Sequence, residues 1–90
     1  MIIIKDEQYL SQLFNILKYI AKDKKSAALY FERKLNKKII FLKDNPAQYR
    51  KSIYFDDEHY RDLIYQGYTI IYKIEKEKIL ILEIFKWIDR

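Results

Sequence analysis

The stretch from Tyr60 to Trp87 constrains the fold most, because it alternates apolar segments with short breaks. Gly67, the only glycine of the chain, separates two of these segments. Every second residue from Ile70 to Glu75 is apolar and large, which is the period of a half-buried strand. Ile79–Phe85 is nearly continuous in isoleucine and leucine, which is typical of a central strand covered on both faces. The charged residues 75–78 between them predict a solvated turn.

Shorter strands and two helices are predicted upstream. Lys51–Phe55 and Tyr60–Tyr65 each have the pattern of a short strand, and Ile2–Ile4 predicts another at the start of the chain. Asp6 is placed to cap a first helix, and Asp23 or Ser26 to cap a second. Apolar spacing predicts the side chains that these helices bury. They are Leu10, Leu13, Phe14, Leu17 and Ile20 in the first helix, and Ala28, Phe31, Leu35, Ile39 and Leu42 in the second.

These elements predict one α+β domain spanning residues 1–90. The expected order is β-α-α-β-β-β, with the two helices packed as a hairpin on one face of a mostly antiparallel sheet. Ninety residues suffice for one compact core. One glycine and one proline mean that the loops must be few and short.

Composition excludes several classes of site. The chain has no cysteine, which rules out disulfides and thiolate metal sites, and its one histidine, His59, argues against a zinc site. We therefore expect no metal and no cofactor. The apolar run at the start is too short for a signal peptide, and no run reaches the ~20 residues of a membrane span. We expect a cytoplasmic protein without a membrane partner.

The charge is unevenly distributed. The net charge is +5; residues 1–50 hold 11 lysines and arginines against 5 acids, whereas residues 51–90 hold 7 against 8. The basic half points to an acidic partner, either a nucleic acid or an acidic protein. The alternative is that the lysines lie on the surface and only keep the protein soluble.

An ordered set of short patterns resembles the RelE/ParE superfamily of bacterial type II toxins. After the two-helix start come A-x-x-F-x-x-x-L-x-x-x-I at Ala28–Ile39, then Leu42, Pro46 and Arg50, then Y-R-D-L, G-Y-x-I-x-Y and I-L-x-I-F. The resemblance covers about residues 5–87. It implies a small toxin that a cognate antitoxin holds inactive, in a toxin–antitoxin hetero-oligomer.

The superfamily divides by activity. RelE-like members cut mRNA in the ribosome without a metal, whereas ParE-like members poison DNA gyrase and lack the nuclease residues. Where RelE-like sequences carry an arginine after Gly-Tyr, this chain has Thr69, and Tyr60 and Asp62 stand near positions where they carry lysines. ParE-like sequences carry an arginine at the position of Arg61. The resemblance therefore favours gyrase inhibition without enzymatic activity. The alternatives are an mRNA interferase and a non-toxic remnant that only binds its antitoxin.

Two sets of candidate residues follow from the resemblance and from charge. The partner-binding set is Arg61, Arg50, Lys86, Trp87 and Arg90. For a ribonuclease the catalytic set is Arg61, Arg50, Lys86, Tyr60 and His59, with the cations holding phosphate and Tyr60 or His59 moving the proton. Each has a structural alternative. Arg61 would pair with Asp56, Asp57 or Glu58, Arg50 would anchor its turn, Trp87 would close the core, and His59 would be an ordinary exposed side chain.

Overall fold

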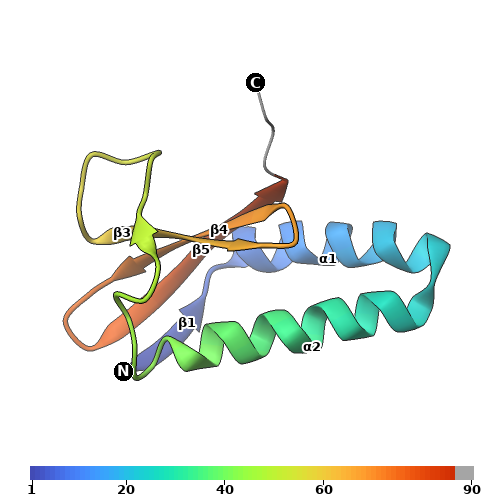
Figure 1. Ribbon diagram of the computed structural model, residues 1–90, viewed down its shortest axis with the longest axis horizontal. Coiled ribbons are helices and arrows are strands. Elements are labelled where there is room, and N and C mark those ends of the chain that lie inside the picture. The colour runs from blue at the N-terminus through green and yellow to red at the C-terminus, as the bar shows by residue number, and fades with distance from the viewer. Residues whose placement is uncertain (87–90) are drawn as a thin grey trace.

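A computed structural model describes residues 1–86 and shows an α+β fold (Figure 1). Its elements are β1 (Ile2–Lys5), α1 (Glu7–Asp23), α2 (Lys25–Phe41), β2 (Arg50–Lys51), β3 (Tyr60–Tyr65), β4 (Tyr68–Ile74) and β5 (Lys78–Lys86). The predicted fold class is confirmed, and the order contains one strand more than β-α-α-β-β-β. The predicted strand at Lys51–Phe55 is wrong beyond its first residue, because β2 ends at Lys51.

The five strands form one sheet in the order β1-β5-β4-β3-β2. The pairing of β1 with β5 is parallel, and the other three pairings are antiparallel. The two helices run side by side against one face, which we call the inner face, and their connecting end reaches beyond the sheet (Figure 1). No helix within residues 1–86 is long and apolar enough to cross a membrane.

Local chemistry fixes where the elements begin and end. The Asp6 carboxylate accepts a hydrogen bond from the Gln8 backbone N–H at 3.0 Å, so Asp6 caps α1 as predicted. The helices are joined by Lys24 alone, in an extended conformation and with no side-chain cap, so the predicted caps Asp23 and Ser26 are wrong. Gln66 and Gly67 have φ of 53° and 81°, the pair of positive values that a tight two-residue hairpin needs.

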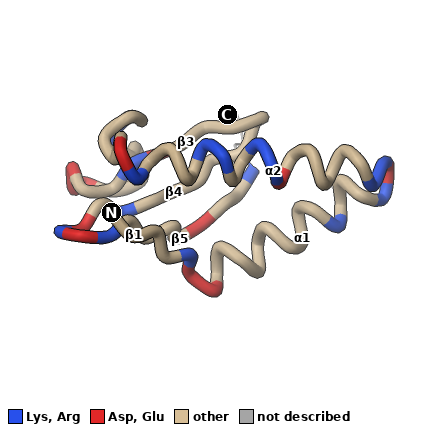
Figure 2. Tube along the Cα trace, turned by 90° about the horizontal axis from the view of Figure 1, so that it is seen from below, with Lys and Arg blue, Asp and Glu red and all other residues tan. Residues whose placement is uncertain are grey.

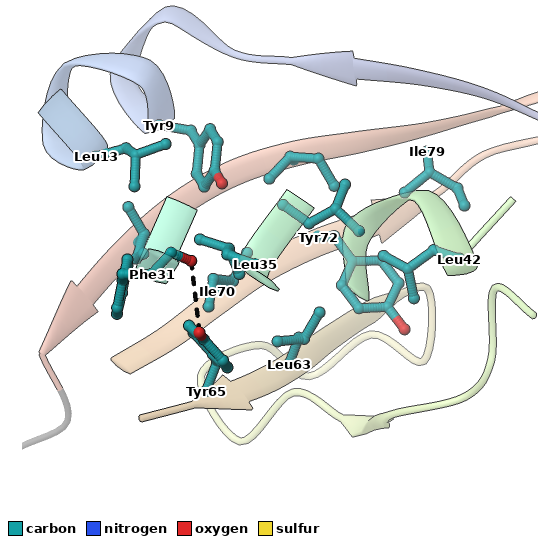
Figure 3. Close-up of a cluster of buried hydrophobic side chains, with 13 residues drawn as sticks. Tyr9, Leu13, Phe31, Leu35, Leu42, Leu63, Tyr65, Ile70, Tyr72 and Ile79 are labelled. Carbon is teal, nitrogen blue, oxygen red and sulfur yellow. Dashed lines mark hydrogen bonds between the residues drawn. The ribbon is translucent and has the colours of Figure 1, made fainter. Parts of the chain in front are cut away.

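The core lies between the helices and the inner face of the sheet (Figure 3). All five side chains predicted for the second helix are buried, from Ala28 to Leu42, the residue that follows α2. In α1 the prediction is partly wrong, because Tyr9 and Leu13 are buried while Leu10 and Phe14 are 47% and 62% exposed. The reason is that α1 is apolar on two adjacent faces, and packing selects the face that begins at Tyr9.

An irregularity in β5 keeps its isoleucines on the core side. Ile71 pairs with Glu83 and Tyr72 with Ile81, which leaves Leu82 as an extra residue in β5. The bulge shifts the alternation by one, so Ile79, Ile81 and Ile84 all face the core. The opposite, outer face is not covered by a helix, and Leu80 and Leu82 are half-buried.

Candidate functional site

The segment that follows α2 is tied to the sheet by two side chains. Arg61 Nη1 donates to the Tyr49 carbonyl at 3.0 Å, and the Tyr72 hydroxyl donates to the Pro46 carbonyl at 2.7 Å. Arg61 is partly buried, and within residues 1–86 it makes no ion pair with Asp56, Asp57 or Glu58. Its guanidinium therefore supports the chain between α2 and β2, and the alternative of an ion pair with the acidic turn is wrong.

Arg50 pairs with a different residue of β3, Asp62. Its Nη2 lies 3.4 Å from Asp62 Oδ2, and the same oxygen accepts the Ile53 backbone N–H at 3.1 Å. The Asp62 side chain is fully buried, whereas the Arg50 side chain is 47% exposed. Because neighbouring residues of a strand point to opposite faces, Arg61 and Asp62 lie on opposite faces of β3. The two arginines therefore approach β3 from opposite sides.

The loop of residues 52–59 covers part of the outer face. The Tyr54 ring meets the Phe85 ring edge-on at 5.3 Å, and Phe55 stacks on Tyr60 at 4.1 Å. Because Phe85 belongs to β5, the loop that carries Tyr54 lies over β3 and β4. On β4, Thr69 and Ile71 are 0% and 2% exposed, although no helix lies on this face. The loop thus closes over the centre of the outer face.

His59 and Tyr60 lie at the start of β3, beside the β4–β5 turn. His59 Nδ1 lies 2.8 Å from Asp57 Oδ1, and the His59 side chain is 60% exposed. Hydrogen bonds from the backbone N–H and then the imidazole of His59 lower the pKa of Asp57. Lys73 Nζ lies 5.3 Å from the centre of the Tyr60 ring, and Tyr60, followed by Glu75, raises the pKa of Lys73. Asp57, His59, Lys73 and Glu75 are among the residues that line a groove of about 630 Å³.

Lys86 lies at the other end of the sheet. It is the register partner of Tyr68, whereas Arg61 is the partner of Tyr72, four residues further along β4 and roughly 13 Å away. The candidate cations therefore do not gather around one point, although His59 and Tyr60 do lie together. Trp87 and Arg90 lie outside the described residues. Residues 1–86 contain no cluster of three or more acidic or histidine side chains that could hold a metal.

A second surface was not predicted as a site. It is the groove between α1 and α2 on the side away from the sheet, about 560 Å³ in volume, and we call it the hairpin groove. Its lining residues are Phe14, Leu17, Lys18, Ala21, Lys25, Ala28, Leu29 and Glu32. The signal in the sequence was the excess of apolar residues in α1 over what one buried face can hold. Figure 2 shows lysine and arginine along α2 and at the turn between the helices.

A helical hairpin on one face of a mostly antiparallel sheet is the architecture that the resemblance to RelE/ParE toxins predicts. The family model of the ParE toxin of the type II toxin–antitoxin system parDE matches residues 3–86, so the chain belongs to the ParE toxin family. A chain of the chromosomal ParDE toxin–antitoxin system from P. aeruginosa has the same fold, with a TM-score of 0.80 at 17% identity. The match covers 98% of this chain and 97% of that chain. No curated protein sequence matches.

Proposed function

We propose that this ParE-family toxin stops growth by binding DNA gyrase in the cytoplasm, and that a cognate antitoxin neutralises it in a hetero-oligomer. The choice of gyrase as the target rests on the burial of Thr69. In a RelE-like nuclease this position holds an arginine, whereas here Thr69 is fully buried on the face closed by the 52–59 loop. A side chain at this position cannot reach a phosphate unless the loop moves.

The remaining cations support the same interpretation. In-line attack by a 2′-hydroxyl requires several positive donors around one phosphate, and removing one such donor typically costs ~10²–10³ in rate. Arg61 is committed to the Tyr49 carbonyl, Arg50 lies near the opposite face, and Lys86 is at the far end of the sheet. A toxin with cations so placed acts by binding a protein rather than by cleaving RNA.

An mRNA interferase is the second candidate, and one cluster favours it. His59 and Asp57 are hydrogen-bonded at 2.8 Å and line an open groove together with Lys73, whose Nζ lies 5.3 Å from the centre of the Tyr60 ring. A histidine held by a carboxylate can act as a general base, and a lysine can bind a phosphate. In this alternative Arg61, Arg50 and Lys86 would hold the substrate only after a rearrangement.

The test is to induce the chain in growing cells without its antitoxin. We expect DNA synthesis to stop early, cells to become filamentous and the DNA-damage response to rise, while bulk translation continues. The purified protein should inhibit gyrase supercoiling in vitro. Primer extension on mRNA from the same cells provides the contrast, because early cleavages within translated codons would favour the interferase. Normal growth together with antitoxin binding would identify a non-toxic remnant.

A further inference from the structure

The β3–β4 hairpin and the two helices enclose a pocket with an aromatic wall, which we call the tyrosine pocket. Tyr30, Phe31, Tyr65 and Tyr68 are among the residues that line it. The centre of the Phe31 ring lies 5.0 Å from that of Tyr65 and 5.5 Å from that of Tyr68. At about 310 Å³ the pocket is at the lower end of the roughly 300–1,000 Å³ found for small-molecule sites. It therefore has room for one flat ring beside several aromatic side chains.

Two of the four rings are fixed and two are accessible. Phe31 and Tyr65 are 7% and 6% exposed, and the Tyr65 hydroxyl donates to the Phe31 carbonyl at 3.4 Å (Figure 3). Tyr30 is 50% exposed and Tyr68 is half-buried. The buried pair makes a rigid floor of the pocket, and Tyr30 and Tyr68 offer ring surface to a ligand. Because the rings of the floor are already ordered, stacking against them costs little conformational entropy.

Two lysines of α2 lie against the tyrosines of this pocket. Lys34 Nζ is 5.4 Å from the centre of the Tyr30 ring, and Lys38 Nζ is 5.9 Å from the centre of the Tyr65 ring. In the part of the chain that the structure describes, neither lysine makes an ion pair and no residue lining the pocket is acidic. The two lysines are about one helical turn apart, roughly 6 Å along the axis. The pocket therefore adjoins a strip of uncompensated positive charge, which suits an anionic ligand.

We propose that the tyrosine pocket binds one unpaired base of single-stranded DNA, and that Lys34 and Lys38 hold the phosphates on either side of that base. Aromatic rings on which bases stack and a positive strip that follows the backbone are the two elements of sites that bind single strands without reading their sequence. The choice of DNA over RNA rests on the proposed function, because a toxin bound to gyrase lies next to the DNA that gyrase holds.

Charge and shape disfavour the other occupants. A cationic group would suit the aromatic rings, but Lys34 and Lys38 would repel it. A second copy of the chain would bring the same lysines together, and like charges in a desolvated contact are costly. An apolar side chain of a protein would fill the pocket but would leave both ammonium groups without an anionic partner. A base in a duplex is paired and stacked, so only an unpaired base can enter.

The test uses the full chain and fluorescein-labelled strands of about 12 nucleotides, a length within the usual range of single-strand sites. One strand is oligothymidine DNA, one is its abasic analogue with the same phosphates, and one is oligouridine RNA. Fluorescence anisotropy should show saturable binding of the thymidine strand, with the abasic strand roughly tenfold weaker or worse because it cannot stack. Equal binding of these two strands would mean that charge alone attracts them, which would overturn the proposal. Tighter binding of the uridine strand would overturn the choice of DNA.

Two variants of Tyr30 test the stacking. Tyr30→Ala should weaken binding of the thymidine strand roughly tenfold, whereas Tyr30→Phe keeps the ring and should bind the strand as the unmodified chain does. Because Tyr30 is 50% exposed, both variants should keep nearly the same melting temperature. Equal affinities of the two variants would place the strand elsewhere on the molecule and overturn the proposal. So would displacement of the strand by a peptide with tryptophan between glutamates at lower concentrations than by the unlabelled strand, because the occupant would then be a protein.

Salt dependence tests the two lysines. The slope of log affinity against log salt concentration changes by about 0.7 for each phosphate contact with a single strand, so Lys34→Ala with Lys38→Ala should make it about 1.4 shallower. The matched control is Arg33→Ala with Lys37→Ala, which removes the same charge at the same spacing. Arg33 and Lys37 line a different hollow of α2, so the slope should not change in this control. Equal changes in the two double variants would contradict the assignment of the lysines.

A gyrase assay separates this inference from the proposed function. Strand binding needs the toxin alone, whereas inhibition of supercoiling needs gyrase. If the chain binds the thymidine strand through Tyr30 but leaves supercoiling unaffected, the proposed function fails and the tyrosine pocket stands. If the chain inhibits supercoiling but does not bind the strand, the tyrosine pocket fails and the proposed function stands. The expected result is inhibition by the unmodified chain together with weaker strand binding by Tyr30→Ala.

Discussion

Arg61 and Tyr72 lie opposite each other on β3 and β4, and both donate hydrogen bonds to carbonyls of the same loop. Arg61 reaches Tyr49 and Tyr72 reaches Pro46, at 3.0 and 2.7 Å. The segment between α2 and β2 consists of turns, and these two side-chain bonds tie it to the sheet. They fix the position from which the chain enters β2 and the 52–59 loop.

Replacing Arg61 with alanine should therefore destabilise the fold. The change removes a charge-assisted hydrogen bond and leaves the Tyr49 carbonyl without this donor, a loss of about 1–3 kcal/mol in the free energy of unfolding. Urea denaturation measures it. The control is Arg33→Ala, an exposed cation on α2 whose loss should cost less than about 0.5 kcal/mol. If Arg61 only contacts a partner, both variants will unfold at the same urea concentration.

The stability of the protein should fall in strong alkali in a way that depends on Tyr72. Burial raises the pKa of Tyr72 from its ordinary value of 10.0 to about 12. A raised folded-state pKa means that the stabilisation is complete below pH 10 and is lost as the pH rises through 12. Tyr72→Phe should be less stable than the unmodified chain at pH 7, by about 1 kcal/mol for the lost hydrogen bond. Between pH 9 and 12 the unmodified chain should lose about 2 kcal/mol relative to Tyr72→Phe, so the order of stability should reverse, because each pKa unit is about 1.4 kcal/mol. Urea titrations at fixed pH test this, and a constant gap would contradict it.

Asp62→Ala should loosen the 52–59 loop without unfolding the sheet. The buried carboxylate accepts from the Ile53 N–H and pairs with Arg50, so its removal leaves both donors unpaired. We expect a loss of about 1–3 kcal/mol and faster amide hydrogen exchange at Ile53, with the β4 amides still protected. Glu58→Ala, an exposed acid in the same loop, is the control and should change neither quantity. Equal protection of Ile53 in both variants would show that the Asp62 carboxylate does not hold the loop.

The inner face of α2 should carry much of the stability. Leu35 and Phe31 are 0% and 7% exposed, so truncating either to alanine should cost about 2–5 kcal/mol. Lys34→Ala and Lys37→Ala are matched changes on the same helix and should cost less than about 0.5 kcal/mol each. Thermal or urea unfolding of the four variants measures the difference. Similar values for the two pairs would mean that α2 is rotated about its axis.

The free toxin should be more prone to aggregation than its complex. Leu10, Phe14 and Leu29 on the helices, and Ile53 and Ile64 near the outer face of the sheet, are large and exposed. A partner that binds only the folded state adds about 4 kcal/mol at a thousandfold excess over its dissociation constant. The antitoxin that rescues growth should therefore raise the melting temperature and suppress aggregation in light scattering. No shift at saturating antitoxin would contradict this.

Much of the fold could be predicted because its pattern is strongly periodic. The burial of α2 and the bounds of β3 follow directly from apolar spacing and from the break at Gly67. The buried face of α1 could not be predicted in the same way. A helix that is apolar over both the Tyr9 and the Phe14 faces has two plausible inner sides, and only contact with the sheet selects one.

The candidate site was harder to predict because its residues depend on pairing register. Adjacent residues such as Arg61 and Asp62 point to opposite faces, so their nearness in sequence does not bring them to one surface. The first part of the 52–59 loop has the composition of a strand, since Ile53, Tyr54 and Phe55 are all good strand formers. The Asp62 carboxylate holds the backbone of Ile53 instead, and aromatic contacts with Phe85 and Tyr60 complete a loop.

The parallel pairing of β1 with β5 sets the order in which the toxin can form. Ile2 at the start of the chain has Lys78 as its partner, so the sheet cannot close until the last strand has been synthesised. Contacts between such distant residues form slowly, since a long loop must be closed first. A nascent or prematurely terminated chain that lacks β5 leaves β1 without a partner strand and β4 paired with β3 alone. Formation of the complete sheet is therefore close to all-or-none, and it waits for the last strand of the chain.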